Sequence, residues 1–190
     1  AALPGEAFGQ LAGPVFLPVL SELARRDRRD FRAQLVRIRS AALPLGVALC
    51  FGVVTFSPAF FALFYDRRYA TAGWMAQVMV GTVWLGLLEL FTNKSLLALG
   101  RVRVLALAGG VRALVGIAGA VAGSSIAGLP GFIIGLSAGA LAQLAIEHLE
   151  LARCGSAVWR SDLTHTAALA LLAGAATWAQ TWAAPLSLSN

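Results

Sequence analysis

Residues 18–65 read PVLSELARRDRRDFRAQLVRIRSAALPLGVALCFGVVTFSPAFFALFY. The first half of this stretch is crowded with arginine, and no charged residue occurs from Ser40 to Tyr65. A membrane hydrocarbon core roughly 30 Å thick needs about 20 apolar residues in a helix. The pattern therefore predicts a transmembrane helix over Ala41–Phe64. Seven arginines precede it, at positions 25, 26, 28, 29, 32, 37 and 39.

The composition of the chain is typical of an integral membrane protein. Of its 190 residues, 58% are hydrophobic and 13% are charged, whereas soluble domains average about 25% charged residues. The net charge of +6 is concentrated in short links between apolar runs, as membrane topology requires, so we expect no nucleic-acid partner. Because the chain opens on Ala1 inside an apolar stretch, we expect it to be part of a longer protein.

Several further apolar runs predict an all-α, polytopic bundle of five or six transmembrane helices. An apolar segment over residues 1–20 precedes the arginines, and AGLPG at 127–131 has turn chemistry. After the first charge-free run, further spans are predicted at Ala70–Phe91, Val104–Ile126, Phe132 to slightly beyond Ile146, and Leu163–Ala184.

The distribution of basic residues predicts which ends of these spans are cytoplasmic. Lys and Arg crowd the cytoplasmic ends of membrane spans. Residues 21–40, 92–103 and 147–162 hold seven, three and two basic residues, whereas the intervening links hold two (Arg67 and Arg68) and none. The alternation is consistent at every crossing and predicts a multi-pass protein of the inner (cytoplasmic) membrane.

The segment just before the first span has an amphipathic pattern of its own. Phe31, Leu35 and Ile38 recur on one helical face, while Arg32 and Arg39 lie elsewhere on the helix. This pattern favours a helix that lies along the membrane surface before the span begins. The arginines of this segment are also candidates for contacts with anionic membrane lipids.

Glycine spacing predicts where helices touch. Gly119 and Gly123 are four residues apart, and so are Gly135 and Gly139. Small residues at this spacing expose a bare face on which another helix can approach closely. We therefore expect these glycines to be packing surfaces.

Polar residues within the apolar runs predict contacts between helices. Gln77 and Gln143 lie inside predicted spans, where an amide usually bonds to a neighbouring helix. Pro44 and Pro58 lie inside the first span, where helix-breaking residues are tolerated if neighbours satisfy the freed carbonyl groups.

Arg112 is the leading candidate for a substrate contact. It lies eight residues past Val104, roughly 12 Å along the predicted helix. A charge at the membrane centre costs about 2.5–3.5 kcal/mol on insertion scales, so such a residue usually faces a cavity or a partner. One interpretation is a fork-like contact to a phosphate or an acidic sugar. The alternative is that the span begins near Gly109–Gly110 and the side chain extends to the inner interface.

Three other charged residues complete the candidate substrate-binding set. Glu89 is expected to pair with Arg112 or Arg103, or to carry a coupling proton or cation. Lys94 and Arg103 flank the same predicted inner mouth and suit an anionic headgroup, although the topology signal explains them equally well. The sequence has no clustered acids or DxD-like motif, so we expect a protein that is not an enzyme and has no catalytic residue, metal site or cofactor.

Four segments carry a recognisable order of features. They are VFLPVLSELARRDRRDFR at 15–32, SPAFFALFYDRRYATAGWMAQVM at 57–79, LLALGRVRVLALAGGVRALVGI at 96–117 and GLPGFIIGLSAGALAQLAIEHLELAR at 128–153. Together they resemble the polysaccharide (O-antigen type) flippases of the multidrug/oligosaccharidyl-lipid/polysaccharide exporter superfamily. Asp66 replaces the usual glycine of that family's turn. The resemblance extends over about residues 10–153.

The resemblance implies a fold and a function. Residues 1–153 would form the second of two six-helix lobes, followed by a cytoplasmic connector and one further transmembrane helix over 154–190. The protein would move a lipid-pyrophosphate-linked oligosaccharide, a polysaccharide precursor, from the inner to the outer leaflet, with a possible coupling ion or proton. The alternatives are a multidrug or small-molecule exporter of the same superfamily, a membrane enzyme of glycolipid synthesis, or a structural membrane subunit.

The predicted orientation can be tested by cysteine labelling from outside the cell. Single cysteines near Asp66 and near Gly128 are expected to react with a membrane-impermeant reagent, because both positions fall in links poor in basic residues. Cysteines near Arg28 and near Arg101 are expected to stay unlabelled unless the membrane is permeabilised. Labelling of intact cells near Arg28 would invert the topology.

Overall fold

The computed structural model describes residues 21–22, 28–65 and 70–183, and within these ranges its main elements are helices. The predicted all-α bundle is confirmed, and α2, α3 and α4 are each long and apolar enough to cross a membrane. The predicted helix over residues 1–20 and the turn at 66–69 lie outside the described residues. The helices are α2 (Arg28–Phe64), α3 (Ala70–Ala98), α4 (Val102–Arg153) and α5 (Trp159–Ala183).

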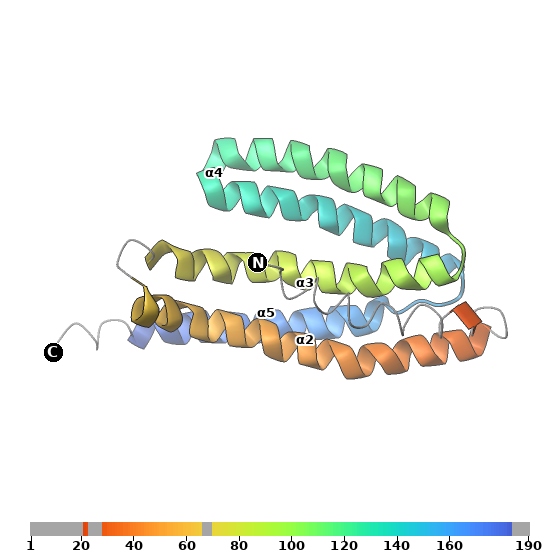
Figure 1. Ribbon diagram of the computed structural model, residues 1–190, viewed down its shortest axis with the longest axis horizontal. Helices are drawn as coiled ribbons and strands as arrows, with labels where there is room; N and C mark the ends of the chain where they lie inside the picture. Colours follow the sequence, from red (N-terminus) through yellow and green to blue (C-terminus); the bar gives the residue numbers. More distant parts are fainter. Residues whose placement is uncertain (1–20, 23–27, 66–69, 184–190) are drawn as a thin grey trace.

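Helix α4 folds back on itself near its middle and forms two antiparallel arms (Figure 1). The break is at Ala127 and Gly128, whose backbone angles are not helical. Gly128 has φ +61°, a conformation that glycine adopts without the steric cost of a Cβ atom. Pro130 suits the first turn of the second arm, where a missing N–H leaves no hydrogen bond unmade. The turn predicted from AGLPG is therefore confirmed.

Two glycines end helices at the opposite end of the bundle. Gly100 and Gly155 have φ values of +72° and +76°. After each of them, a backbone N–H donates to the carbonyl five residues earlier at 2.9 Å, which is the Schellman ending of a helix. Residues 92–98 and 147–153, which the sequence pattern placed in polar links, are consequently helical.

The helices pack in the order α4, α3, α2 and α5. Helix α3 packs on both α4 and α2, and α5 packs on α2 (Figure 1). Their directions bring the start of α2, the α3–α4 link and the α4–α5 link to one end, at the right of Figure 1. The first twelve residues of α2 contain five arginines, and Lys94, Arg101, Arg103, Arg153 and Arg160 lie within or no more than five residues from the two links, so we call this the basic end.

Helix α2 contradicts the expectation of a separate surface helix before the first span. It runs without interruption from the arginine-rich segment into the apolar run. Phe31 and Leu35 are fully buried against protein, in a cluster with Leu96, Leu151 and Val158. The amphipathic pattern reflects packing against protein, because the apolar face of α2 covers the ends of α3 and α4 and does not lie on lipid.

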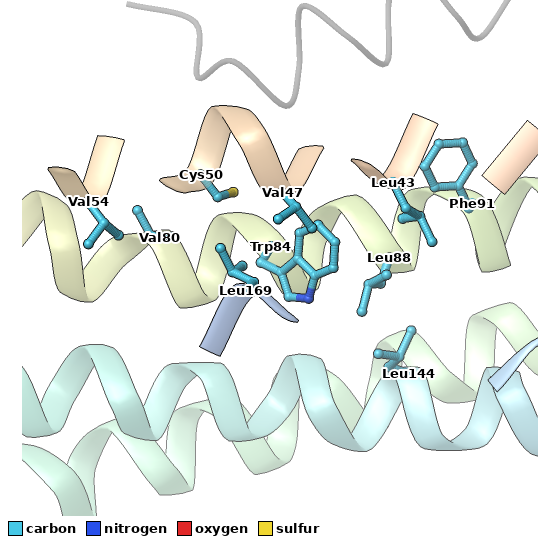
Figure 2. Packing of buried hydrophobic residues seen from close by; sticks show 10 residues of the cluster. All are labelled: Leu43, Val47, Cys50, Val54, Val80, Trp84, Leu88, Phe91, Leu144 and Leu169. Atoms are coloured by element: carbon cyan, nitrogen blue, oxygen red, sulfur yellow. The ribbon is translucent and has the colours of Figure 1, made fainter. Parts of the chain in front are cut away.

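The main core lies between α2 and α3 and is closed by one residue each from α4 and α5 (Figure 2). Trp84 is 2% exposed at its centre, and its indole N–H donates to the Thr166 hydroxyl on α5 at 2.9 Å. An indole N–H needs such a partner when it is buried. The cluster comprises Leu43, Val47, Cys50, Val54, Val80, Trp84, Leu88, Phe91, Leu144 and Leu169.

The backbone carbonyls near Pro58 are satisfied by two amide side chains. A proline at 58 cannot donate to the carbonyl of Val54, four residues earlier. The Gln77 amide donates to this oxygen at 2.8 Å, and the Gln180 amide donates to the carbonyl of Thr55 at 3.1 Å. The Gln77 amide also donates to the Gln180 side-chain oxygen at 2.9 Å. The predicted interhelical bond of Gln77 is therefore confirmed, and it joins α2, α3 and α5.

The glycines of α4 bring the backbones of its two arms into direct contact. A Cβ atom on Gly119 would overlap the carbonyl oxygen of Gly135, and one on Gly123 would overlap that of Gly131. Glycine is the residue that permits so close an approach. The prediction that these glycines form a contact face is confirmed, and the partner face is the other arm of the same helix.

Leucine substitutions test which glycines of α4 form the contact between its two arms. Gly119→Leu or Gly135→Leu is expected to lower the free energy of unfolding by about 1–3 kcal/mol or more, because the clash is with backbone and cannot be relieved by a rotamer change. Gly110→Leu is the control, since a Cβ atom there would meet nothing within 4 Å. Thermal unfolding in detergent measures the difference. Equal unfolding temperatures for all three variants would contradict the contact.

Candidate functional site

Arg112 and Glu89 form an ion pair that joins α4 to α3. The Arg112 Nη1 atom lies against the Glu89 Oε1 atom. Arg112 is ten residues into α4 and Glu89 is nine residues from the end of α3, so both lie roughly 14 Å from the basic end. The sequence-based hypothesis that Glu89 pairs with Arg112 agrees with this contact, and the alternative pairing with Arg103 does not.

The second arm of α4 adds two side chains to this pair. Gln143 is 4% exposed, and its side-chain oxygen lies 3.4 Å from the Arg112 Nη1 atom. The Gln143 amide donates at 2.8 Å to Glu147, which is fully buried. Arg112, Glu89, Gln143 and Glu147 therefore form one polar cluster, which we call the Arg112 cluster. The predicted interhelical hydrogen bond of Gln143 is confirmed by the weak contact to Arg112 between the arms.

The charges of the Arg112 cluster do not balance. The cluster contains two carboxyl groups and one guanidinium, and the Oε2 atoms of Glu89 and Glu147 are buried without a hydrogen-bond partner. Burying an ionised carboxylate without a matching charge costs several kcal/mol. The arrangement therefore favours the presence of one further positive charge, either a bound proton or a cation.

The two sides of the Arg112 guanidinium differ in their surroundings. The Arg112 side chain is 45% exposed, whereas the Glu89 side chain is 13% exposed. Glu89 therefore contacts the guanidinium from the protein side, and nearly half of the Arg112 side chain stays accessible. A guanidinium presented in this way can bind a phosphate or a carboxylate through two parallel N–H bonds.

Lys94 and Arg103 are not brought into the Arg112 cluster. Lys94 lies five residues beyond Glu89 on α3 and is half-buried, and Arg103 lies nine residues before Arg112 on α4 and is exposed. Both lie nearer the basic end, between the cluster and the α3–α4 link. Neither residue takes part in the ion pair or the hydrogen bonds of the Arg112 cluster.

A second buried ionic group lies near the basic end and holds α5 in place. Arg39 of α2 is fully buried, and its Nη1 atom pairs with the Asp162 carboxylate. The His148 Nε2 atom lies 3.1 Å from the same carboxylate, and the Arg39 guanidinium lies 5.9 Å from the centre of the Phe91 ring. These contacts join α2, α3, α4 and the first turn of α5.

The ionisation of Asp162, which precedes the apolar part of α5, follows from its partners. Burial favours the neutral form of the carboxyl group. The hydrogen bond from His148 and the charge and hydrogen bond of Arg39 outweigh burial and lower the pKa of Asp162 below 3.8. Asp162 is consequently ionised at neutral pH and serves as a permanent anchor for Arg39.

Sequence reasoning missed Glu147 and the Arg39 group. Glu147 was placed in a polar link because it borders a basic segment, yet it follows Gly139 and Gln143 at intervals of four residues on one face of α4. That spacing was the available signal. Arg39 was interpreted only as a signal of membrane orientation, because its partner Asp162 is 123 residues away in the chain.

Comparisons with known proteins return no match. No family model, curated protein or solved structure matches the chain. Within the described residues, no group of three or more His, Cys, Asp or Glu side chains is arranged to hold a metal ion. The geometry of the Arg112 cluster and the resemblance of the four segments are therefore the two features that bear on function.

The Arg112 cluster predicts a charge rescue in protein stability. Arg112→Ala is expected to lower the free energy of unfolding by about 1–3 kcal/mol, because buried Glu89 loses its charged partner. Adding Glu89→Gln is expected to recover most of the loss, since the uncompensated carboxylate is then gone. Unfolding temperature and abundance in the membrane measure both effects. Additive losses in the double variant would mean that the pair is not coupled.

Proposed function

We propose that this protein is part of a transporter that flips a lipid-linked oligosaccharide across the inner membrane. The Arg112 cluster carries the proposal, because it holds a half-exposed guanidinium at membrane depth in a helical bundle. The cost of placing a charge at that depth implies that Arg112 faces water, a ligand or another protein segment. The polysaccharide precursor supplies a suitable ligand, since its pyrophosphate group matches the guanidinium fork.

The orientation of the bundle supports an inward-facing entrance for the substrate. If the basic end is cytoplasmic, as the distribution of Lys and Arg favours, α2, α3 and both arms of α4 cross the membrane as a multi-pass unit. Lys94 and Arg103 then lie between the cytoplasm and Arg112. Their charges would attract an anionic headgroup toward the Arg112 cluster.

The excess carboxylate in the Arg112 cluster supports coupling to a proton or cation. Glu89 contacts Arg112 directly, and Glu147 is connected to it through Gln143. An anion that draws Arg112 away from Glu89 would leave two unneutralised carboxylates, which would then take up a proton or cation. Substrate release and proton or cation release would be linked by the same contact.

Substitutions at Arg112 test the substrate contact. Arg112→Lys is expected to retain part of the export activity, because the charge survives and the planar fork does not. Arg112→Glu is expected to be the least active variant, since a like charge would meet the pyrophosphate. Export of the polysaccharide precursor, normalised to protein abundance and measured in the complete transporter, is the relevant quantity.

A matched control separates substrate binding from structural support. Arg103→Ala removes an exposed arginine of the same helix that has no contact with the Arg112 cluster, and a milder loss of export is expected from it. The double variant Arg112→Ala/Glu89→Gln is expected to be stable yet inactive. Normal export by Arg112→Glu at normal abundance would end the proposal that Arg112 contacts the substrate.

A further inference from the structure

A cavity at the basic end lies apart from the Arg112 cluster. Its volume is about 290 Å³, and it opens between the start of α2 and the start of α5. Helix α2 contributes Arg32 and Val36, and residues 157–161 contribute the opposite wall. Neither the Arg112 cluster nor the buried Arg39 side chain lines this cavity.

Two arginines in this cavity have no acidic counterpart. Arg32 and Arg160 both line it, and none of its described lining residues is acidic. Asp162, two residues from Arg160, is already paired with Arg39, and Asp30, two residues from Arg32, is exposed and does not line the cavity. Two guanidinium groups that share a cavity repel each other unless an anion lies between them. The charge pattern therefore favours an anionic ligand.

The remaining walls of the cavity are mostly apolar. Val36 and Val158 face it from opposite elements, and Trp159 lies beside them with its ring under the Arg160 guanidinium, 5.5 Å from centre to centre. Tryptophan at a membrane–water interface combines an apolar ring with a polar edge at headgroup level. A ligand that suits this cavity carries an anionic group next to an apolar portion.

We propose that this cavity binds the phosphate headgroup of an anionic membrane phospholipid, with Arg32 and Arg160 contacting the phosphate. Val36, Val158 and Trp159 then contact the glycerol and upper acyl-chain carbons. Helix α5 begins at Trp159 in the wall of this cavity, so the positive end of its helix dipole lies at the same site. This site is independent of the proposed transport function, because it uses none of the residues of the Arg112 cluster.

The location of the cavity is consistent with a lipid source for the phosphate. It lies at the basic end, where Arg39 and Asp162 anchor α5 to α2 one turn deeper. If the basic end is cytoplasmic, the cavity faces the leaflet whose anionic lipids attract Lys and Arg. A lipid in the cavity would connect the first turns of α2 and α5 beyond their buried ion pair.

Native mass spectrometry of the purified full chain tests the site directly. Phosphatidylglycerol and phosphatidylcholine are added in turn to the detergent-solubilised protein, and the occupancy of each complex is measured over a concentration series. Phosphatidylglycerol is expected to bind more tightly. Arg32→Gln and Arg160→Gln are each expected to weaken its binding about fivefold, because an arginine near an anionic lipid surface contributes about that factor.

Two further variants keep the outcome unambiguous. Arg37→Gln removes an exposed arginine from the same helix outside the cavity and is expected to bind phosphatidylglycerol as the unmodified protein does. Val36→Asp leaves every arginine in place but adds a negative charge to the cavity at a position that is 43% exposed. It is expected to abolish the preference for phosphatidylglycerol over phosphatidylcholine.

Inorganic phosphate distinguishes a lipid headgroup from a free anion. If the site takes a lipid, excess phosphate is expected to displace phosphatidylglycerol poorly, because it lacks the apolar contacts. Displacement by phosphate at concentrations similar to those of the lipid would assign the site to a free anion and overturn the proposal. Equal weakening by Arg37→Gln and by the two cavity variants would overturn it as well, since binding would then reflect overall charge.

Discussion

The backbone contact between the two arms of α4 sets the positions of the residues on which the candidate site depends. The carbonyl oxygen of Arg112 lies against Gly139, so that a Cβ atom on this glycine would overlap it. One turn further along the second arm, Gln143 comes within reach of the Arg112 side chain. A larger residue at 139 would push the arms apart and take Gln143 and Glu147 away from Arg112. Packing and site geometry are thus set by the same contact.

The two ionic groups of the bundle differ in the exposure of their arginines. Arg39 is fully enclosed with Asp162, and its environment offers no route for another anion. Arg112 contacts Glu89 and Gln143, and 45% of its side chain is exposed. Buried pairs of the first kind contribute little net stability but specify how helices are arranged. A half-covered arginine of the second kind is able to exchange its partner. This difference, more than the presence of charge itself, is the reason for placing the function at Arg112.

Much of the fold could be predicted from the sequence, because apolar runs and turn residues are local signals. The helix over 41–64, the turn at Ala127–Gly128 and the glycine contact face followed from such signals. The ends of α3 and α4 were not predicted, since charged residues were interpreted as the beginnings of loops. The two helices instead end at Gly100 and Gly155, which have positive φ angles. The amphipathic face at Phe31 and Leu35 was also misassigned, because an apolar stripe has the same pattern whether lipid or protein covers it.

The candidate site was predictable in part. A charge inside an apolar run is visible in the sequence, so Arg112 and Glu89 were identified. The identity of a distant partner is not a local property, and this explains why Arg39 could not be connected to Asp162. The glycine positions also indicate which residues of the two arms lie opposite each other. Gly123 faces Gly131 and Gly119 faces Gly135 at nearly equal distances from the turn, and extending this register places Gln143 beside Arg112.

The hydrogen bonds around Pro58 have a consequence for how the protein is assembled in the membrane. Gln180 donates to the carbonyls of Val54 and Thr55 and also accepts from Gln77. The groups that bond to the Gln180 amide all belong to α2 and α3, which precede α5 in the chain. During synthesis, α5 emerges last of these helices and meets a completed set of acceptors. The Gln180 hydrogen bonds can therefore form only after α2 and α3 have been made, and the Val54 carbonyl that Pro58 leaves free is one of the acceptors that hold α5 in the bundle.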